Sequence, residues 1–304
     1  MPEVPDYAPL CAAPDRMPRL PRIPFPRGAC DCHAHIFGPA AEFPYAAERV
    51  YTPPDSTWDH YRSLLATLGI ERAVLVQPSV YGTDNRAMLA ALAAAGHGLR
   101  AVAVTDPDVS AGELETLHRA GVRGLRFNLV DRRDARNVAP AETLRAVAHR
   151  IAPLGWHLEL LINLDEAGEF ASVLAGLPVP IVLGHMGYPR AGARAWLDAP
   201  GFAALLRLLE GGRFWIKLTG PYRISTLELP YDDVDAVARR LVAAAPQRML
   251  WGTDWPHAMM KKKMPNDGDL CDLLERWAPD ARTRTLVDNP AELYGFESGE
   301  KISA

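Results

Sequence analysis

The sequence has few cysteines, no strong excess of charge and no long apolar run. Four cysteines in 304 residues are too few for a disulfide framework, and we expect a reducing, cytoplasmic location. The formal net charge is −4 and the longest basic run is the Lys-Lys-Lys of residues 261–263, so no nucleic-acid partner is expected. No apolar stretch reaches the length of a membrane span. What remains is the composition of an ordinary soluble globular protein.

Two familiar sequence signals are also missing. Neither a G-x-G-x-x-G nor a Walker A pattern follows any apolar run, which weakens a nucleotide-binding interpretation. Residues 1–27 are rich in proline but lack the apolar centre of a signal peptide. We expect them to form an extended arm on the surface. One expected role of this arm is to contact a second copy of the protein in a homo-oligomer. Residues 28–304 would then form the folded domain.

Short apolar runs alternate with helical stretches along that domain. Seven candidate helices separate most of the runs, at residues 57–68, 85–95, 110–120, 140–152, 166–175, 202–210 and 234–244. Apolar strands that alternate with amphipathic helices indicate a parallel sheet covered by helices. Eight such units predict an α/β fold of the (β/α)₈ TIM-barrel type. The eight runs lie at residues 29–37, 73–79, 101–107, 124–130, 156–163, 180–187, 214–222 and 248–257.

The first run contains the stretch CDCHAHIFGP, which mixes two cysteines with two histidines. Side chains alternate between the two faces of a strand. Regular alternation places Asp31, His33 and His35 on one face and the two cysteines on the other, so the four cannot converge on one ion. We therefore expect Cys30 and Cys32 to pack as small apolar residues against the outer helices.

Chemically active residues stand at the ends of several runs. The active sites of TIM barrels lie at the carboxyl ends of the strands, where side chains from different strands meet. Three histidines and one aspartate are expected there: His33 and His35 from the first run, His185 from the sixth and Asp254 from the eighth. Such a set can hold one divalent cation or act directly in acid–base chemistry. The residues alone leave both options open.

Several of these stretches carry a family resemblance. DCHAHIFGP, LGHMG, WGTDWPH and DNPAELYGF resemble the amidohydrolase superfamily, in its amidohydrolase-2 branch, over residues 28–297. RVYTPPDSTWDHY, QPSVYGTDN, GVRGLRFNL and KLTGPYR are similar to the branch members that hydrolyse 2-pyrone-4,6-dicarboxylate and sulfomuconolactone. The resemblance implies a carboxylic-ester hydrolase, a lactonase of aromatic-compound catabolism that opens the ring of a small anionic substrate.

The resemblance also implies the roles of the central residues. The catalytic set is His33, His35, His185 and Asp254, with the aspartate activating water and the histidines polarising the lactone carbonyl. In the metal-dependent members the same four residues hold one divalent cation, here zinc or manganese. The pyrone-dicarboxylate hydrolases imply a site that works without metal. A two-metal site is not expected, because no lysine ends the fourth run and no histidine ends the fifth.

Contacts to the carboxylates of the substrate follow from the same resemblance. Arginine suits them because its planar guanidinium donates two parallel hydrogen bonds. Those pyrone-dicarboxylate enzymes carry a tyrosine where this sequence has Leu161, a departure that favours sulfomuconolactone or a related muconolactone. The residues implied to bind substrate are Tyr51, Ser79, Arg126, Arg132 and Arg223.

Two other functions compete with lactone hydrolysis. One is nonoxidative, metal-dependent decarboxylation, a second chemistry of this superfamily, which would release carbon dioxide and stop on chelation. The other is a binding module on a barrel that has lost its activity. The complete set of three histidines and one aspartate argues against the second alternative.

Overall fold

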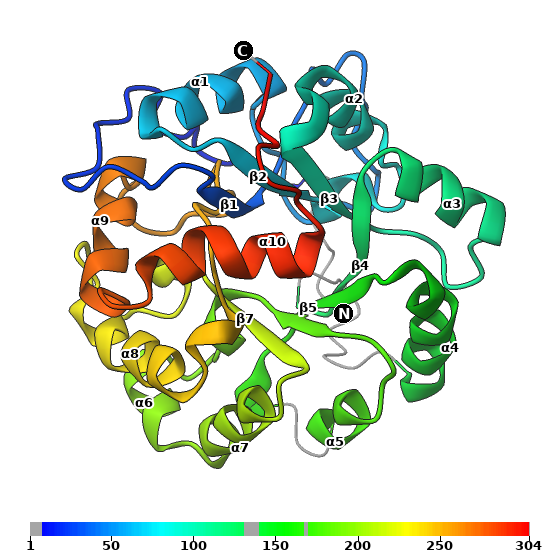
Figure 1. Cartoon of the computed structure of the whole chain (residues 1–304). Helices are drawn as coiled ribbons and strands as arrows, with labels where there is room; N and C mark the ends of the chain where they lie inside the picture. Colours follow the sequence, from blue (N-terminus) through cyan, green and yellow to red (C-terminus); the bar gives the residue numbers. More distant parts are fainter. Residues whose placement is uncertain (1–7, 131–139, 167–169, 304) are drawn as a thin grey trace, which may run out of the picture.

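The computed structural model describes residues 8–130, 140–166 and 170–303. Its eight parallel strands follow one another around a single sheet in chain order, and helices surround them (Figure 1). The strands are β1 Cys30–Ala34, β2 Arg72–Val76, β3 Leu99–Ala103, β4 Val122–Asn128, β5 His157–Leu161, β6 Ile181–Leu183, β7 Phe214–Leu218 and β8 Met249–Trp251. The described α-helices are α1 Trp58–Leu68, α2 Arg86–Ala95, α3 Ala111–Arg119, α4 Ala141–Ile151, α5 Phe170–Ala175, α6 Ala193–Asp198, α7 Pro200–Glu210, α8 Asp235–Ala244, α9 Asp267–Trp277 and α10 Asn289–Tyr294.

The first and last strands meet through the residues that follow β8. An isolated parallel bridge joins Ala34 to Trp255. The amide of His35 donates to the backbone oxygen of Trp255 at 2.8 Å, and the amide of Asp254 donates to that of His33 at 2.8 Å. The eight strands therefore form a nearly closed barrel, which confirms the predicted fold class. The closure also brings the histidine stretch of β1 against the aspartate that follows β8.

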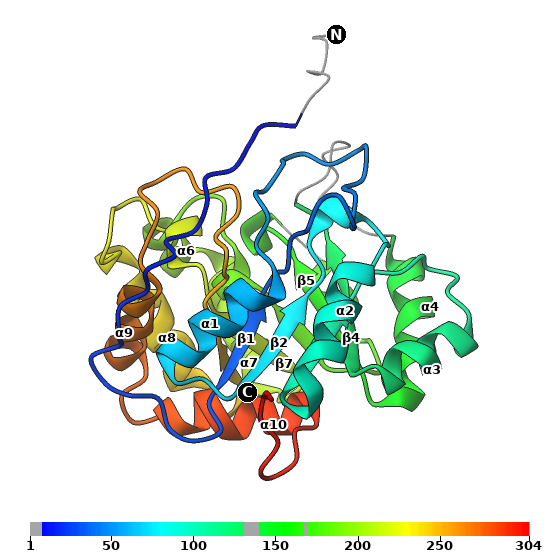
Figure 2. The same cartoon turned by 90° about the horizontal axis from the view of Figure 1, so that it is seen from above.

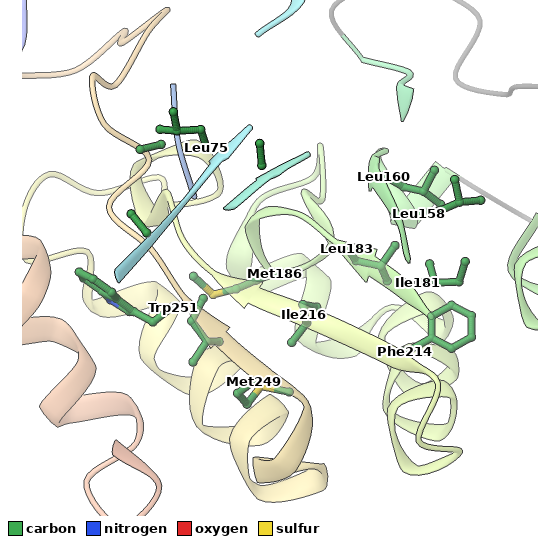
Figure 3. Close-up of a cluster of buried hydrophobic side chains, with 14 of the residues drawn as sticks. Leu75, Leu158, Leu160, Ile181, Leu183, Met186, Phe214, Ile216, Met249 and Trp251 are labelled. Atoms are coloured by element: carbon green, nitrogen blue, oxygen red, sulfur yellow. The ribbon is translucent and has the colours of Figure 1, made fainter. Parts of the chain in front are cut away.

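The main hydrophobic core lies between the barrel and its helices. Alternate strand residues point outward into it, among them Leu75, Leu160 and Ile216 (Figure 3). Amphipathic helices supply the other side, with Leu64 and Leu65 of α1 as one example. Each strand thus buries one face against the helices, as a parallel barrel requires.

A second apolar cluster fills the interior of the barrel. It joins residues of six strands, such as Val74, Val102 and Val182, which can meet one another only inside the ring. Tyr294 of α10 and the nearby Phe296 complete this cluster. Figure 2 shows α10 at one end of the barrel and the long loop after β1 at the opposite end. The interior is therefore plugged from the amino-terminal side, and a site can open only at the carboxyl ends of the strands.

A β-bulge in β1 overturns the expected alternation of its side chains. Asp31 pairs with Ala73 but Ala34 pairs with Leu75, so β1 has one extra residue over this stretch. Cys30 and Cys32 belong to the interior cluster, and their predicted position against the outer helices was wrong. Asp31 faces outward instead and accepts a hydrogen bond from the hydroxyl of Tyr61 in α1. Because of the extra residue, the side chains of two consecutive residues, Cys32 and His33, both point into the barrel.

The close approach of β1 to the chain after β8 depends on Gly252. A Cβ atom at this position would lie 2.6 Å from the amide nitrogen of His33 and 2.9 Å from its Cβ. We therefore expect Gly252→Ala to lower the free energy of unfolding by about 1–3 kcal/mol, the usual cost of overpacking. Urea unfolding followed by circular dichroism measures this loss.

The matched control is Gly112→Ala in α3. A Cβ atom there meets nothing within 4 Å, and alanine suits a helix better than glycine. This variant should unfold at the same or a higher urea concentration than the wild type. If Gly252→Ala unfolded like Gly112→Ala, the barrel would not close as tightly as described.

The helices largely follow the sequence prediction. Each of the seven predicted segments overlaps one α-helix, although residues 167–169 of the segment predicted at 166–175 lie outside the described residues. The prediction missed α6, α9 and α10. Residues 8–27 contain no helix and no named strand, and Arg19 among them donates to Asp269 of α9 at 2.7 Å. Within the described residues, no helix is both long enough and apolar enough to cross a bilayer.

Candidate active site

A small pocket opens where the strands end, and its volume is about 20 Å³. This is room for roughly one water molecule. Larger hollows lie elsewhere on the surface, such as one of about 340 Å³ beside Arg19, but they hold none of the predicted site residues. The small pocket is lined by His35, Tyr51, Ser79, Arg126, Leu161, His185, Tyr188, Arg223, Ala258 and Met259.

Three of the four predicted central residues form a tight buried group below this pocket. Ligand atoms of His33, His35 and Asp254 all lie within 4.8 Å of one another. Oδ1 of Asp254 is 3.6 Å from Nε2 of His33 and 3.8 Å from Nε2 of His35. Both distances are too long for a direct hydrogen bond, so neither histidine occupies this carboxylate oxygen.

One carboxylate oxygen of Asp254 accepts two hydrogen bonds, and the other has no hydrogen-bond partner among the described residues. Its backbone has a φ of +63°, in the left-handed region, so the turn after β8 directs its side chain. Oδ2 accepts from the hydroxyl of Tyr222 at 2.7 Å and from Nε of Arg223 at 2.6 Å, whereas Oδ1 has no hydrogen-bond partner among the described residues. Burial alone would raise the pKa of this carboxyl, but the charge of Arg223 holds it well below its usual range. Asp254 is therefore an ionised carboxylate whose unpaired oxygen lies next to the pocket residue His35.

A backbone oxygen orients the ring of His35, and a hydroxyl group orients that of His185. Nδ1 of His35 lies 2.7 Å from the backbone oxygen of Val76, and Nδ1 of His185 lies 2.9 Å from Oγ1 of Thr219. Burial lowers the pKa of His35 to about 4 and that of His185 to about 3. Both rings are therefore neutral at physiological pH.

The ring of His33 contacts a buried ion pair between Lys217 and Glu159, which the sequence analysis missed. Nζ of Lys217 in β7 lies 3.0 Å from Nδ1 of His33 and 2.6 Å from Oε2 of Glu159 in β5. Both charged residues are almost completely buried inside the barrel. The sequence did contain a sign of this ion pair. The apolar run FWIKL includes one lysine, and the run HLELL includes one glutamate, so the two strands carry opposite charges.

The group of His33, His35 and Asp254 could hold a metal ion. Its donors are two imidazoles and one carboxylate, which suit zinc or manganese. Nε2 of His33 and Oδ1 of Asp254 are buried without a hydrogen-bond partner, as atoms facing a bound cation or a bound water would be. His185 lies outside this close group although its ring centroid is 5.1 Å from that of His33, so the predicted four-residue set is brought together only in part.

Four of the five predicted substrate residues line the pocket: Tyr51, Ser79, Arg126 and Arg223. Arg126 donates to the backbone oxygen of Gln77 at 2.8 Å, while its Nε has no partner among the described residues. The Nε of Arg223 is already occupied by Asp254, so this arginine orients the carboxylate as well as lining the pocket. Arg132 lies outside the described residues.

The fold and the site together define a barrel hydrolase, and the chain belongs to the amidohydrolase family Amidohydro_2, whose model matches residues 30–296. A relative from Comamonas testosteroni, 2-pyrone-4,6-dicarboxylate hydrolase, is 40% identical over 91% of this chain and 93% of its own length. The 4-sulfomuconolactone hydrolase of Hydrogenophaga intermedia is 37% identical over 95% of this chain and 96% of its own. A crystal structure of a putative 2-pyrone-4,6-dicarboxylic acid hydrolase from Pseudomonas putida has a TM-score of 0.77 and 32% identity, covering 89% of this chain and 98% of its own. The family resemblance stated from the motifs is confirmed.

Proposed function

We propose that this protein is a lactonase that hydrolyses the ring of a small anionic lactone of the pyrone-dicarboxylate or sulfomuconolactone type, in aromatic-compound catabolism. The observation that carries the proposal is the buried carboxylate of Asp254. One of its oxygens is held by Tyr222 and Arg223, and the other has no partner among the described residues and lies 3.8 Å from Nε2 of His35, which lines the pocket together with two arginines. The relatives named as hydrolases of such lactones match nearly the whole chain, which supports the same reaction class here.

In this reaction Asp254 acts as the general base. Its free oxygen accepts a hydrogen bond from water and takes a proton as the water attacks the lactone carbonyl. Tyr222 and Arg223 hold the other oxygen, so the carboxylate cannot rotate away from the attacking water. The negative charge that develops on the carbonyl oxygen needs donors beside it, and the imidazoles of the cluster are the nearest candidates.

The same aspartate then completes the ring opening. The acyl–oxygen bond breaks, and the ring oxygen leaves as an enolate or alkoxide. Because its neighbours lower the pKa of Asp254, the carboxyl holds the new proton weakly and passes it readily to this oxygen. One water is consumed, and a carboxylic acid and an enol or alcohol are formed. The acid releases its proton to solvent and becomes a carboxylate, and Asp254 returns to its starting state.

A divalent cation is compatible with this scheme but is not required by it. His33, His35 and Asp254 would hold the ion. A bound zinc or manganese ion supplies Lewis-acid polarisation of the carbonyl and lowers the pKa of water. All proton transfers described above are made by Asp254.

The pocket favours an anionic substrate with an apolar ring. Arg126 and Arg223 contribute positive charge, and the hydroxyl of Ser79 is buried without a partner among the described residues. Leu161 lies at the end of β5 in the same lining, so one wall has no hydrogen-bonding group. A carboxylate or sulfonate beside Arg126, with the ring against Leu161, satisfies both features.

The test is an ultraviolet-monitored hydrolysis assay with three substrates. We expect loss of ring absorbance with 2-pyrone-4,6-dicarboxylate, with 4-sulfomuconolactone, or with both, and a far lower kcat/KM with an uncharged six-membered lactone. Equal turnover of the uncharged lactone would contradict the proposed substrate charge. Failure of both anionic lactones would contradict the substrate class.

A further inference from the structure

The partner of His33 at Nδ1 determines what the other ring nitrogen can do. A neutral imidazole carries one N–H, so one nitrogen donates and the other accepts. A lysine ammonium has three donors and no acceptor. Nζ of Lys217 forms a buried ion pair with Oε2 of Glu159 at 2.6 Å and lies 3.0 Å from Nδ1 of His33. Nδ1 must then accept, and the single proton of the ring lies on Nε2.

Two other protonation states of His33 fit the surroundings less well. Protonation of both nitrogens would direct an N–H at the Lys217 ammonium, whose Nζ is 3.0 Å away. Protonation at Nδ1 alone would need Glu159 as acceptor, yet Oε1 of Glu159 is 3.4 Å from Nδ1, farther than the ammonium. Glu159 instead remains a carboxylate paired with Lys217, which lowers its pKa despite burial.

His35 has the opposite arrangement. Its Nδ1 is 2.7 Å from the backbone oxygen of Val76, which can only accept. His35 therefore carries its proton on Nδ1 and presents a lone pair at Nε2. Histidines that bind metals usually have this second form, with the N–H donated to an oxygen and the other nitrogen on the ion. His35 is in that form, and His33 is not.

We propose that Lys217 is a positioning residue that fixes the Nε2–H tautomer of His33, which makes His33 a hydrogen-bond donor to the lactone carbonyl and disfavours a divalent cation at this site. Nε2 of His33 is buried with no partner and lies 3.6 Å from Oδ1 of Asp254. A carbonyl oxygen beside Nε2 would meet an N–H there while Oδ1 holds the attacking water. The inference rests on the proposed function only for the identity of this acceptor; the tautomer itself does not depend on it.

The tautomer can be read directly from the ring nitrogens of the protein without substrate. Enzyme labelled with ¹⁵N-histidine and treated with chelator is compared with the His33→Gln variant, whose missing signals identify those of His33. We expect a protonated-type nitrogen at Nε2 and an unprotonated type at Nδ1. The reverse pattern, or protonation of both nitrogens at pH 7.5, would overturn the proposal. Because no substrate is used, this result is independent of whether the protein opens lactones.

Substitution of Lys217 should reverse the preference of the site. In Lys217→Met the Glu159 carboxylate alone faces Nδ1, so the proton of His33 should move to Nδ1 and leave a lone pair at Nε2. We expect zinc affinity, measured by competition with a chromophoric chelator, to rise by at least about 10-fold, the lower end of what outer partners of metal ligands contribute. Unchanged zinc affinity in a folded variant would contradict the proposed role.

Two further variants separate this role from a structural one. Lys217→Arg keeps a cation without an acceptor and should preserve the wild-type nitrogen pattern and weak zinc binding. Lys217→Met/Glu159→Gln removes both charges, so no buried charge is left unpaired, and it should lose the strong preference for either tautomer. If Lys217→Met fails to fold, the double variant and the wild-type spectrum still show whether Lys217 sets the tautomer of His33. A wild-type pattern in the double variant would show that Lys217 does not set the tautomer.

Discussion

Asp254→Asn should lower kcat by about 1,000-fold, within the roughly 100- to 10,000-fold range that general acid–base groups contribute. Asparagine is nearly the same size and tolerates the left-handed backbone at this position, where φ is +63°. Its amide oxygen can still accept from Tyr222 and Arg223, so the loop geometry should persist. What is lost is the negative oxygen that takes the proton from water. Single-turnover kinetics with the preferred lactone measures the change.

The control for this variant is Asp233→Asn. Asp233 is also buried and accepts hydrogen bonds from Ser225 and Thr226, but it does not line the pocket. This change should reduce stability without an effect of comparable size on kcat. If Asp254→Asn kept more than a tenth of the wild-type kcat, Asp254 would not be the general base.

Arg126→Met should raise KM for an anionic lactone by about 10- to 100-fold, because hydrogen bonds to charged groups contribute roughly 1.5–3 kcal/mol. Arg126 lines the pocket, and among the described residues it has no carboxylate within ion-pair distance and an unpartnered Nε. Its side chain is therefore available to a substrate anion, and methionine keeps most of its length without the charge. Initial-rate kinetics over a range of lactone concentrations separates KM from kcat.

Two comparisons make the Arg126 result specific. Arg86→Met removes an exposed arginine that pairs with Asp84, and it should leave KM unchanged. With an uncharged lactone, Arg126→Met should have little effect, since no anion is present for the guanidinium to bind. A similar rise in KM for charged and uncharged lactones would mean that Arg126 supports the pocket without binding the anion.

The repeating pattern of the sequence was sufficient to predict the barrel. Eight apolar runs separated by amphipathic stretches have the period of a parallel barrel, and each run overlaps one strand. Helix α9 was missed, although Asn266 caps its first turn by accepting from the amide of Gly268. Its sequence DGDLCDLLERW begins with two aspartates and a glycine, which are typical of turns as well as of helix starts.

The face on which each β1 residue lies could not be predicted from alternation. The bulge between Asp31 and Ala34 inserts one residue, so the two cysteines and His33 all point inward. A bulge is set by pairing with neighbouring strands and by the hydrogen bonds of Asp31 to Thr253 and Tyr61. None of these partners is near in sequence, so a local pattern cannot reveal it.

The candidate site was predictable in its members but not in its charge pairs. Strand ends identified His33, His35, His185 and Asp254 because a barrel collects those ends at one rim. That Arg223 binds Asp254, and that Lys217 contacts His33, depends on distances between residues 31 and 184 positions apart in the sequence. These pairs decide which oxygen of Asp254 is free and which nitrogen of His33 carries the proton.

Hydrolysis in ¹⁸O-labelled water, with the product analysed by mass spectrometry, tests the central claim most directly. The account predicts a product heavier than the anionic lactone by one molecule of labelled water, with the ¹⁸O in the newly formed carboxylate. A product of unchanged mass would indicate isomerisation, and a product lighter by carbon dioxide would indicate decarboxylation. Either of those results would contradict a lactonase in which Asp254 delivers water to the carbonyl.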